Sequence, residues 1–184
     1  MENTAKNTPR MTAEEYFKAT PETNQPTELL DGEIVALASP TSQHQDIASG
    51  LLTELRLFVK QNGGSCKPFV SPMDVKLDDF NVVQPDVFVT CKPETVKKQY
   101  VDGAPDFVAE IVSSNRSDDF DRKLLLYRTS GVREYWIIDP LYRKTLVYFF
   151  EQRRFPDIYT FDTPIPVRIW DGKLSITISE LEML

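Results

Sequence analysis

Two carboxylates stand in the middle of apolar runs of this chain. Asp86 lies in VVQPDVFV and Glu110 in DFVAEIVS, and both runs have the composition of buried β-strands. A buried carboxylate without a partner is costly, or its pKa rises until it loses its charge. One divalent metal ion would satisfy both acids together, whereas a Lys, an Arg or backbone amides would satisfy each acid separately. The residues themselves leave a metal site and structural ion pairs as alternatives.

The alternation of these runs predicts which side chains share a face. In a strand, side chains two positions apart point to the same side of the sheet. Gln84 is therefore expected on the face of Asp86, where its amide could orient a water molecule, contact a phosphate or simply be satisfied within the sheet. By the same rule, Val108 and Val112 share the face of Glu110.

Lys123 is the cation that the sequence offers to these acids. Residues 117–130 read as a helix, in which Phe120 and Tyr127 mark the inward stripe and Lys123 lies at its edge. From that edge the ammonium could point toward the sheet. The alternative is an ion pair with Asp119 one turn earlier, which would contribute only about 0.2–0.5 kcal/mol.

Elements that would position these side chains follow from local signals. Thr12 and Glu15 form a capping box for a short helix that ends at Ala19. The dipeptide Asp31-Gly32 predicts a β-hairpin. A long helix is expected from a Ser42 cap to the glycines at 63–64.

Further along, strand-like runs alternate with one more helix. FVSPMDVKL (69–77), VVQPDVFVT (82–90) and DFVAEIVS (106–113) predict three strands in series, and the helix at 117–130 followed by REYWIIDP (133–140) predicts a βαβ crossover. KTLVYFFEQRRF, IYTF, VRIW and LSITI predict a C-terminal antiparallel meander, with a last helical turn in SELEML. We expect an α/β fold with a mixed sheet, formed by one domain at 11–184 after a flexible tail at 1–10.

Composition limits the chemistry. A lone His44 and two cysteines outside any Cys/His ligand pattern disfavour zinc, so a metal ion would be a hard one such as Mg²⁺ or Mn²⁺. We expect Cys66 and Cys91 to be small apolar fillers rather than a disulfide framework. No apolar run approaches the roughly 20 residues that span a bilayer. The N-terminal residues also lack the apolar segment of a secretory signal, which predicts a cytoplasmic location.

The net charge of −7 opposes long-range attraction to nucleic acid. The charge is uneven, however, because residues 116–154 hold nine basic against six acidic residues. A local basic surface is therefore compatible with the sequence.

The segments ELLDGEIV, SPTSQHQ, QPDVFV and PDFVAEIVSSNRSDDFDRKLLLYRTSGVREYWIIDP, in this order, resemble the Uma-two family of restriction-endonuclease-like proteins. The resemblance extends from about residue 28 to residue 140. It implies a PD-(D/E)xK nuclease core with Asp86 as the PD aspartate and Glu110 as the second acid, both binding Mg²⁺. The usual motif has a lysine two residues after that acid, where this chain has Val112. Lys123 resembles the migrated lysine of this family, which would hold or deprotonate the attacking water and stabilise the transition state.

Two further residues match the family. Glu28 resembles an acid carried in the same hairpin and could be a third, outer-shell metal ligand, although hairpin carboxylates are often merely exposed. His44 matches the histidine at the start of the first long helix, where a structural role near the cap is the alternative.

The leading hypothesis is an Mg²⁺-dependent or Mn²⁺-dependent endonuclease acting on DNA, or less favourably RNA, in which Asp86, Glu110, Lys123 and Gln84 carry the chemistry. The chain would be a possible homodimer, since two-fold dimers are the commonest oligomers. The alternative keeps the fold but makes the chain a non-catalytic interaction module. A third hypothesis, a site for a small anionic ligand near residues 92–103, has no Gly-rich phosphate loop to support it.

Overall fold

The computed structural model describes residues 10–20, 26–113, 117–152 and 155–182, without the side chains of 117–120. The tail predicted at 1–10 lies outside these residues except for Arg10, whose guanidinium donates to the Asp31 carbonyl over 2.8 Å. The first helix, α1 (Ala13–Ala19), opens with the predicted reciprocal capping box of Thr12 and Glu15.

A five-stranded sheet carries the predicted hairpin. Asp31 and Gly32 adopt φ angles of 52° and 81° at its turn, which explains the Asp-Gly pair. The strand order is β2-β1-β5-β4-β7, and all neighbours are antiparallel except β4 and β7. The strands are β1 (Thr27–Leu30), β2 (Glu33–Ala36), β4 (Asp74–Asp78), β5 (Asn81–Val83) and β7 (Tyr100–Asp102).

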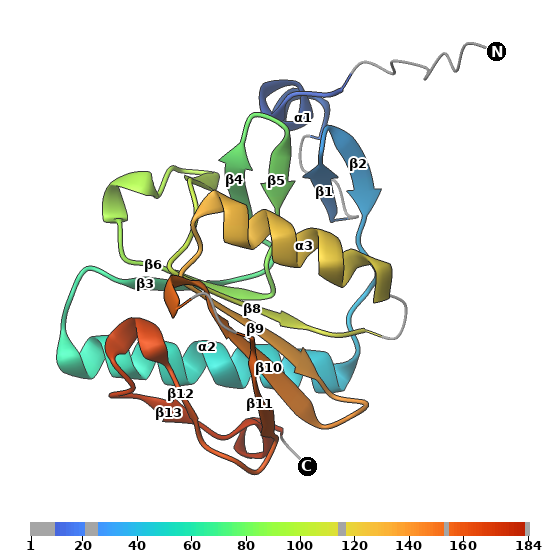
Figure 1. Cartoon of the computed structure of the whole chain (residues 1–184). Helices are drawn as coiled ribbons and strands as arrows, with labels where there is room; N and C mark the ends of the chain where they lie inside the picture. Colours follow the sequence, from blue (N-terminus) through green and yellow to red (C-terminus); the bar gives the residue numbers. More distant parts are fainter. Residues whose placement is uncertain (1–9, 21–25, 114–116, 153–154, 183–184) are drawn as a thin grey trace.

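A six-stranded mixed sheet forms the centre of the molecule, in the order β11-β10-β9-β8-β6-β3. Helix α2 (Ser42–Asn62) covers one of its faces and α3 (Ser117–Ser130) the other (Figure 1). Its strands are β3 (Lys67–Val70), β6 (Val87–Thr90), β8 (Phe107–Ile111), β9 (Glu134–Asp139), β10 (Lys144–Phe149) and β11 (Asp157–Thr160). Smaller elements are β12 (Ile165–Pro166), β13 (Ser175–Ile176) and the 3₁₀ helices η1 (Pro93–Thr95), η2 (Phe150–Gln152), η3 (Arg168–Trp170) and η4 (Ile178–Glu180).

The predicted crossover and most of the meander are confirmed. Strands β8 and β9, which precede and follow α3 along the chain, pair in parallel. Strands β9, β10 and β11 form an antiparallel meander. Three details of these predictions were wrong. The N-cap of α2 is Thr41 rather than Ser42, and VRIW forms η3 instead of a strand. Of LSITI only Ser175–Ile176 is a strand, and the last helical turn is η4.

The two strand-like runs before residue 91 do not form single strands. FVSPMDVKL is divided between β3 and β4, and VVQPDVFVT between β5 and β6, so that each run enters both sheets. Both divisions occur at prolines, Pro72 and Pro85, which cannot donate to a strand ladder. Gln84 and Asp86 thus lie between strands, and the prediction that they share a strand face was wrong.

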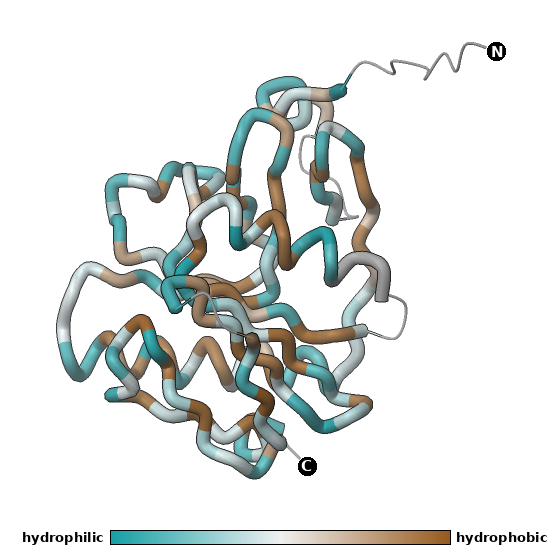
Figure 2. The backbone as a smooth tube through the Cα atoms, in the orientation of Figure 1, coloured by the Kyte–Doolittle hydropathy of each residue, from teal (hydrophilic) through white to brown (hydrophobic). Residues whose placement is uncertain are grey.

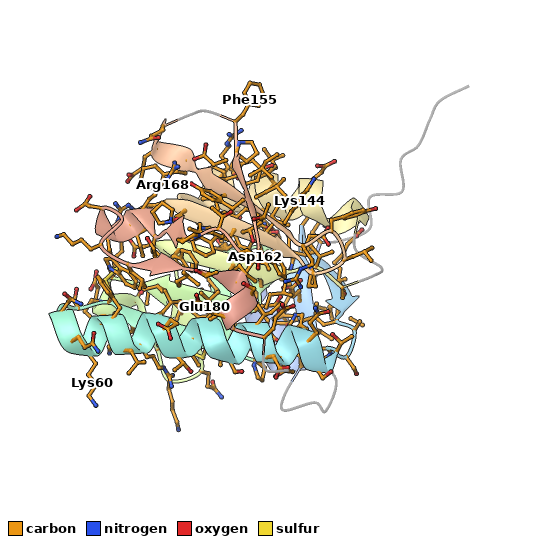
Figure 3. All side chains as sticks on the ribbon, turned by 90° about the horizontal axis from the view of Figure 1, so that it is seen from below. Lys60, Lys144, Phe155, Asp162, Arg168 and Glu180 are labelled. Atoms are coloured by element: carbon orange, nitrogen blue, oxygen red, sulfur yellow. A yellow bond between two sulfur atoms is a disulfide. The ribbon has the colours of Figure 1, made fainter. Side chains whose placement is uncertain are left out.

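Apolar side chains fill both sides of the six-stranded sheet. Against α2, Ile47 and Leu51 pack with Ala109 and Ile111 of β8, and the α3 side buries Val108 with other apolar residues. In Figure 2 much of the central strands is brown, the colour of hydrophobic residues. Figure 3 shows Lys60 of α2 pointing away from the sheet. The predicted alternation of DFVAEIVS is therefore confirmed.

Cys66 and Cys91 form a disulfide, so the prediction of apolar fillers was wrong. They directly precede β3 and directly follow β6, and the antiparallel pairing of these strands brings the two residues together. Within the described residues, no helix combines the length and the apolar character needed to cross a membrane.

Candidate active site

Lys123 is buried between two acids from different sheets. Its side chain projects from α3, and Nζ lies 2.9 Å from Glu28 Oε1 on β1 and 3.1 Å from Glu110 Oε1 on β8. All three side chains are at most 4% exposed. The ammonium therefore faces the sheet, which is one of the two positions that the helical phase left open. The side chain of Asp119, the alternative partner, lies outside the described residues.

Tyr127, one turn after Lys123, completes the surroundings of Glu110. Its hydroxyl donates to Glu110 Oε1 over 2.6 Å. The pKa of Glu110 is raised to about 7, chiefly by burial, with smaller contributions from the negative charges of Asp86 and Glu28; the charge of Lys123 and the Tyr127 hydroxyl act in the opposite direction. Burial also raises the pKa of Tyr127 well above its usual value, so this hydroxyl remains a donor.

Gln84 belongs to the surroundings of Glu28 rather than to those of Asp86. Its backbone N–H donates to Glu28 Oε1, and its side-chain amide donates to Asp74 Oδ1, each over 2.9 Å. Burial raises the pKa of Asp74. Glu28 Oε2 and Gln84 Oε1 are buried acceptors without a hydrogen-bond partner in the described structure. Glu28 is fully buried, which excludes the exposed hairpin carboxylate as its description.

Asp86 stands just before β6, beside the strand that carries Glu110. Its Oδ2 accepts the backbone N–H of Ile111 over 2.8 Å and lies 3.0 Å from Nε2 of His44. Asp86 and His44 also line a cavity of about 240 Å³ between the start of α2, the segment after β2 and the segment after β3. The polar side chains of its wall are Ser39, His44, Gln45, Ser71, Asp86 and Ser113.

The oxygen donors of Asp86 and Glu110 suit a hard cation. In the described part of the chain, the side-chain contacts of Asp86 use Oδ2 and those of Glu110 use Oε1, so each carboxylate keeps a second oxygen. Carboxylate oxygens are the ligands that Mg²⁺ and Mn²⁺ prefer. Among the described residues, however, no three His, Cys, Asp or Glu side chains gather as a metal-binding group. The residues present fit an ion held by two protein carboxylates, with its other positions open.

Comparison with known proteins decides the family. The model of Uma2, described as "Putative restriction endonuclease", matches residues 13–169. The chain belongs to the Uma2 family. No curated protein matches it. Membership of Uma2 supports a nuclease activity in general terms.

A solved structure shares the fold of this Uma2 protein. It is a crystal structure from Anabaena variabilis ATCC 29413, described as "a putative nuclease belonging to DUF820". The TM-score is 0.77 at 22% sequence identity, over 93% of this chain and 97% of the other. At that identity the likeness establishes the fold alone, and the predicted α/β class with a mixed sheet is confirmed.

The sequence interpretation missed two members of this Uma2 site. Tyr127 was assigned to the apolar stripe of its helix, although its position four residues after Lys123 places both side chains on one face. Asp74 lies in a run that was read as one strand, and only the division of that run brings it to Gln84.

Proposed function

We propose that this protein is a metal-dependent endonuclease that hydrolyses phosphodiester bonds in DNA, or less favourably in RNA. The observation that carries the proposal is the buried grouping of Lys123 and Glu110 beside Asp86, and Asp86 itself lines a cavity. Buried charges of this kind, with a raised carboxyl pKa, are typical of functional sites. Membership of Uma2 favours the nuclease reading of that site.

In the proposed mechanism, Asp86 and Glu110 would hold Mg²⁺ or Mn²⁺, and Glu28 would support them from the outer shell. The ion would supply a Lewis acid for the phosphoryl group and lower the pKa of a bound water. Lys123 contributes positive charge beside the attacking water and the transition state. Gln84 fixes Glu28 through its backbone N–H, and its unpaired amide oxygen could accept a hydrogen bond from water.

A non-catalytic interaction module is the second candidate, and one observation favours it. Lys123 is already bonded to two carboxylates, as in a structural ion cluster. The net charge of −7 points the same way, because it opposes binding to a polyanion.

Three finer predictions belong to the proposal. They are a single domain at 11–184, a cytoplasmic location and a homodimer. Exposed apolar side chains such as Phe155, which stands out from the molecule in Figure 3 and is 91% exposed, are compatible with a partner surface. The molar mass in solution, measured by light scattering, tests the homodimer.

The decisive experiment compares metal binding and cleavage in the wild type and in Asp86→Ala. Calorimetry with Mg²⁺ and Mn²⁺ should detect one ion in the wild type and none in the variant, and only the wild type should nick plasmid DNA. Asp102→Ala removes an exposed acid of β7 and serves as the matched control, which should behave as wild type. If the folded wild type binds neither ion, the carboxylates are structural and the interaction module replaces the nuclease.

A further inference from the structure

The imidazole of His44 lies buried against the carboxylate of Asp86. His44 is 8% exposed, and its Nε2 lies 3.0 Å from Asp86 Oδ2, within the usual range of N–H···O separations. Because a carboxylate oxygen only accepts, this nitrogen carries the hydrogen. The same oxygen receives the backbone N–H of Ile111. Donors from α2 and from β8 therefore meet on one oxygen of Asp86.

The position of His44 at the start of α2 does not explain why this residue carries an imidazole. The cap of α2 uses the backbone N–H of His44, which donates to Thr41 Oγ1 over 3.2 Å. Any residue other than proline could supply that N–H. The imidazole itself takes no part in capping. A structural role near the helix cap therefore explains the hydrogen bond of the His44 backbone N–H, and it does not explain the imidazole.

Burial alone does not explain the ring either. Nδ1 of His44 is buried without a hydrogen-bond partner in the described structure, and an unsatisfied buried polar atom costs about 1–3 kcal/mol. An apolar side chain would avoid that cost. Among the described residues, the polar contact of the His44 side chain is the one with Asp86. The orientation of Asp86 is thus the one role that the contacts of this ring support.

We infer that His44 is a positioning residue, which holds Asp86 Oδ2 so that Oδ1 stays turned toward the ion and the substrate. The inference rests on the proposed function, in which Asp86 is a metal ligand. A carboxylate that binds a metal is commonly held by hydrogen bonds from further residues, and loss of such a partner lowers metal affinity by about 10–100-fold. His44 also borders the cavity that Asp86 lines.

Two conservative variants test this role against mere packing. In His44→Gln, the amide nitrogen can reach the position of the imidazole Nε2, whereas in His44→Asn the shorter amide reaches only that of Nδ1. Both variants keep a polar side chain of moderate size. Gln45→Ala is the matched control, because Gln45 is exposed and borders the same cavity. Mn²⁺ affinity is measured by calorimetry, with thermal unfolding of each variant in parallel.

The expected result is a loss of Mn²⁺ affinity of about 10-fold or more in His44→Asn, with His44→Gln and Gln45→Ala within about 3-fold of the wild type. Wild-type affinity in His44→Asn, or an equal loss in both His44 variants, overturns the inference while the proposed function stands. If the wild type binds no Mn²⁺, the proposed function fails and the inference falls with it.

Discussion

Lys123 is a buried cation shared by two buried carboxylates. Removing ions from water is costly, and their mutual attraction repays that cost only when geometry and further hydrogen bonds are good. Here the Tyr127 hydroxyl and the Gln84 N–H add such bonds to the two acids. The three charges therefore depend on one another, and loss of the cation leaves negative charge behind without a partner.

Lys123→Met should lower the free energy of unfolding by about 3–5 kcal/mol, the usual cost of breaking a buried ion pair. Because Glu28 and Glu110 then face each other without the ammonium, adding Glu110→Gln should recover part of the loss. Urea unfolding at constant pH measures both effects. Lys144→Met removes an exposed lysine as the control. Stability of Lys123→Met within about 1 kcal/mol of the wild type would show that the cluster is not coupled in this way.

Helical phase is local, and about eleven residues are enough to define it, so the sequence could place Lys123 at the edge of the inward stripe, within reach of the sheet. The direction of Gln84 was not predictable in this way. Period two holds only while the strand continues, and Pro85 ends it, so Gln84 turns to Glu28 and Asp74 instead of lying beside Asp86.

At the scale of elements, the Cys66–Cys91 disulfide ties the edge strand β3 to β6, the strand that begins next to Asp86. Spacing could not predict it, because the antiparallel register of two strands decides which cysteines meet. A sequence separation of 25 implies that the bond removes loop entropy from the unfolded chain.

Reduction of this disulfide should lower the free energy of unfolding by about 3 kcal/mol. The measurement is urea unfolding with and without a thiol reductant. Cys66→Ser, which cannot form the bond, should have the stability of the reduced protein and no response to the reductant. An equal response of wild type and variant would mean that the reductant acts elsewhere.

At the scale of the molecule, the site exists because two sheets and one helix converge. Glu28 comes from the five-stranded sheet, Glu110 from the six-stranded sheet and Lys123 from α3. Local patterns predicted most elements. No pattern within one stretch of sequence predicts, however, that β1 of one sheet and β8 of the other will both contact the same side chain of α3. The resemblance to a family, rather than periodicity, brought Glu28 into the predicted site. Its full burial and its bond to Lys123 are what only the tertiary structure reveals.

Stability should depend on pH through buried carboxyls with raised pKa values. Burial raises the pKa of Glu134 to about 7, although Trp136 Nε1 and the backbone N–H groups of Ile169 and Arg168 donate to it. Its value before burial is 4.5. The folded state therefore binds more protons than the unfolded state between these values, and stability falls as pH rises through that window.

Glu134→Gln, which cannot titrate, isolates this contribution. The wild-type free energy of unfolding minus that of the variant should fall by about 2 kcal/mol between about pH 5 and about pH 8. The amide of Glu134→Gln keeps only one acceptor oxygen, although three N–H groups donate to this side chain. The variant should therefore be less stable than the wild type at low pH. This constant loss does not change how the difference in free energy of unfolding varies with pH. Urea unfolding across the pH range gives both quantities. A difference that stays constant with pH would place the pKa of Glu134 near 4.5, and the three donors would then balance the effect of burial.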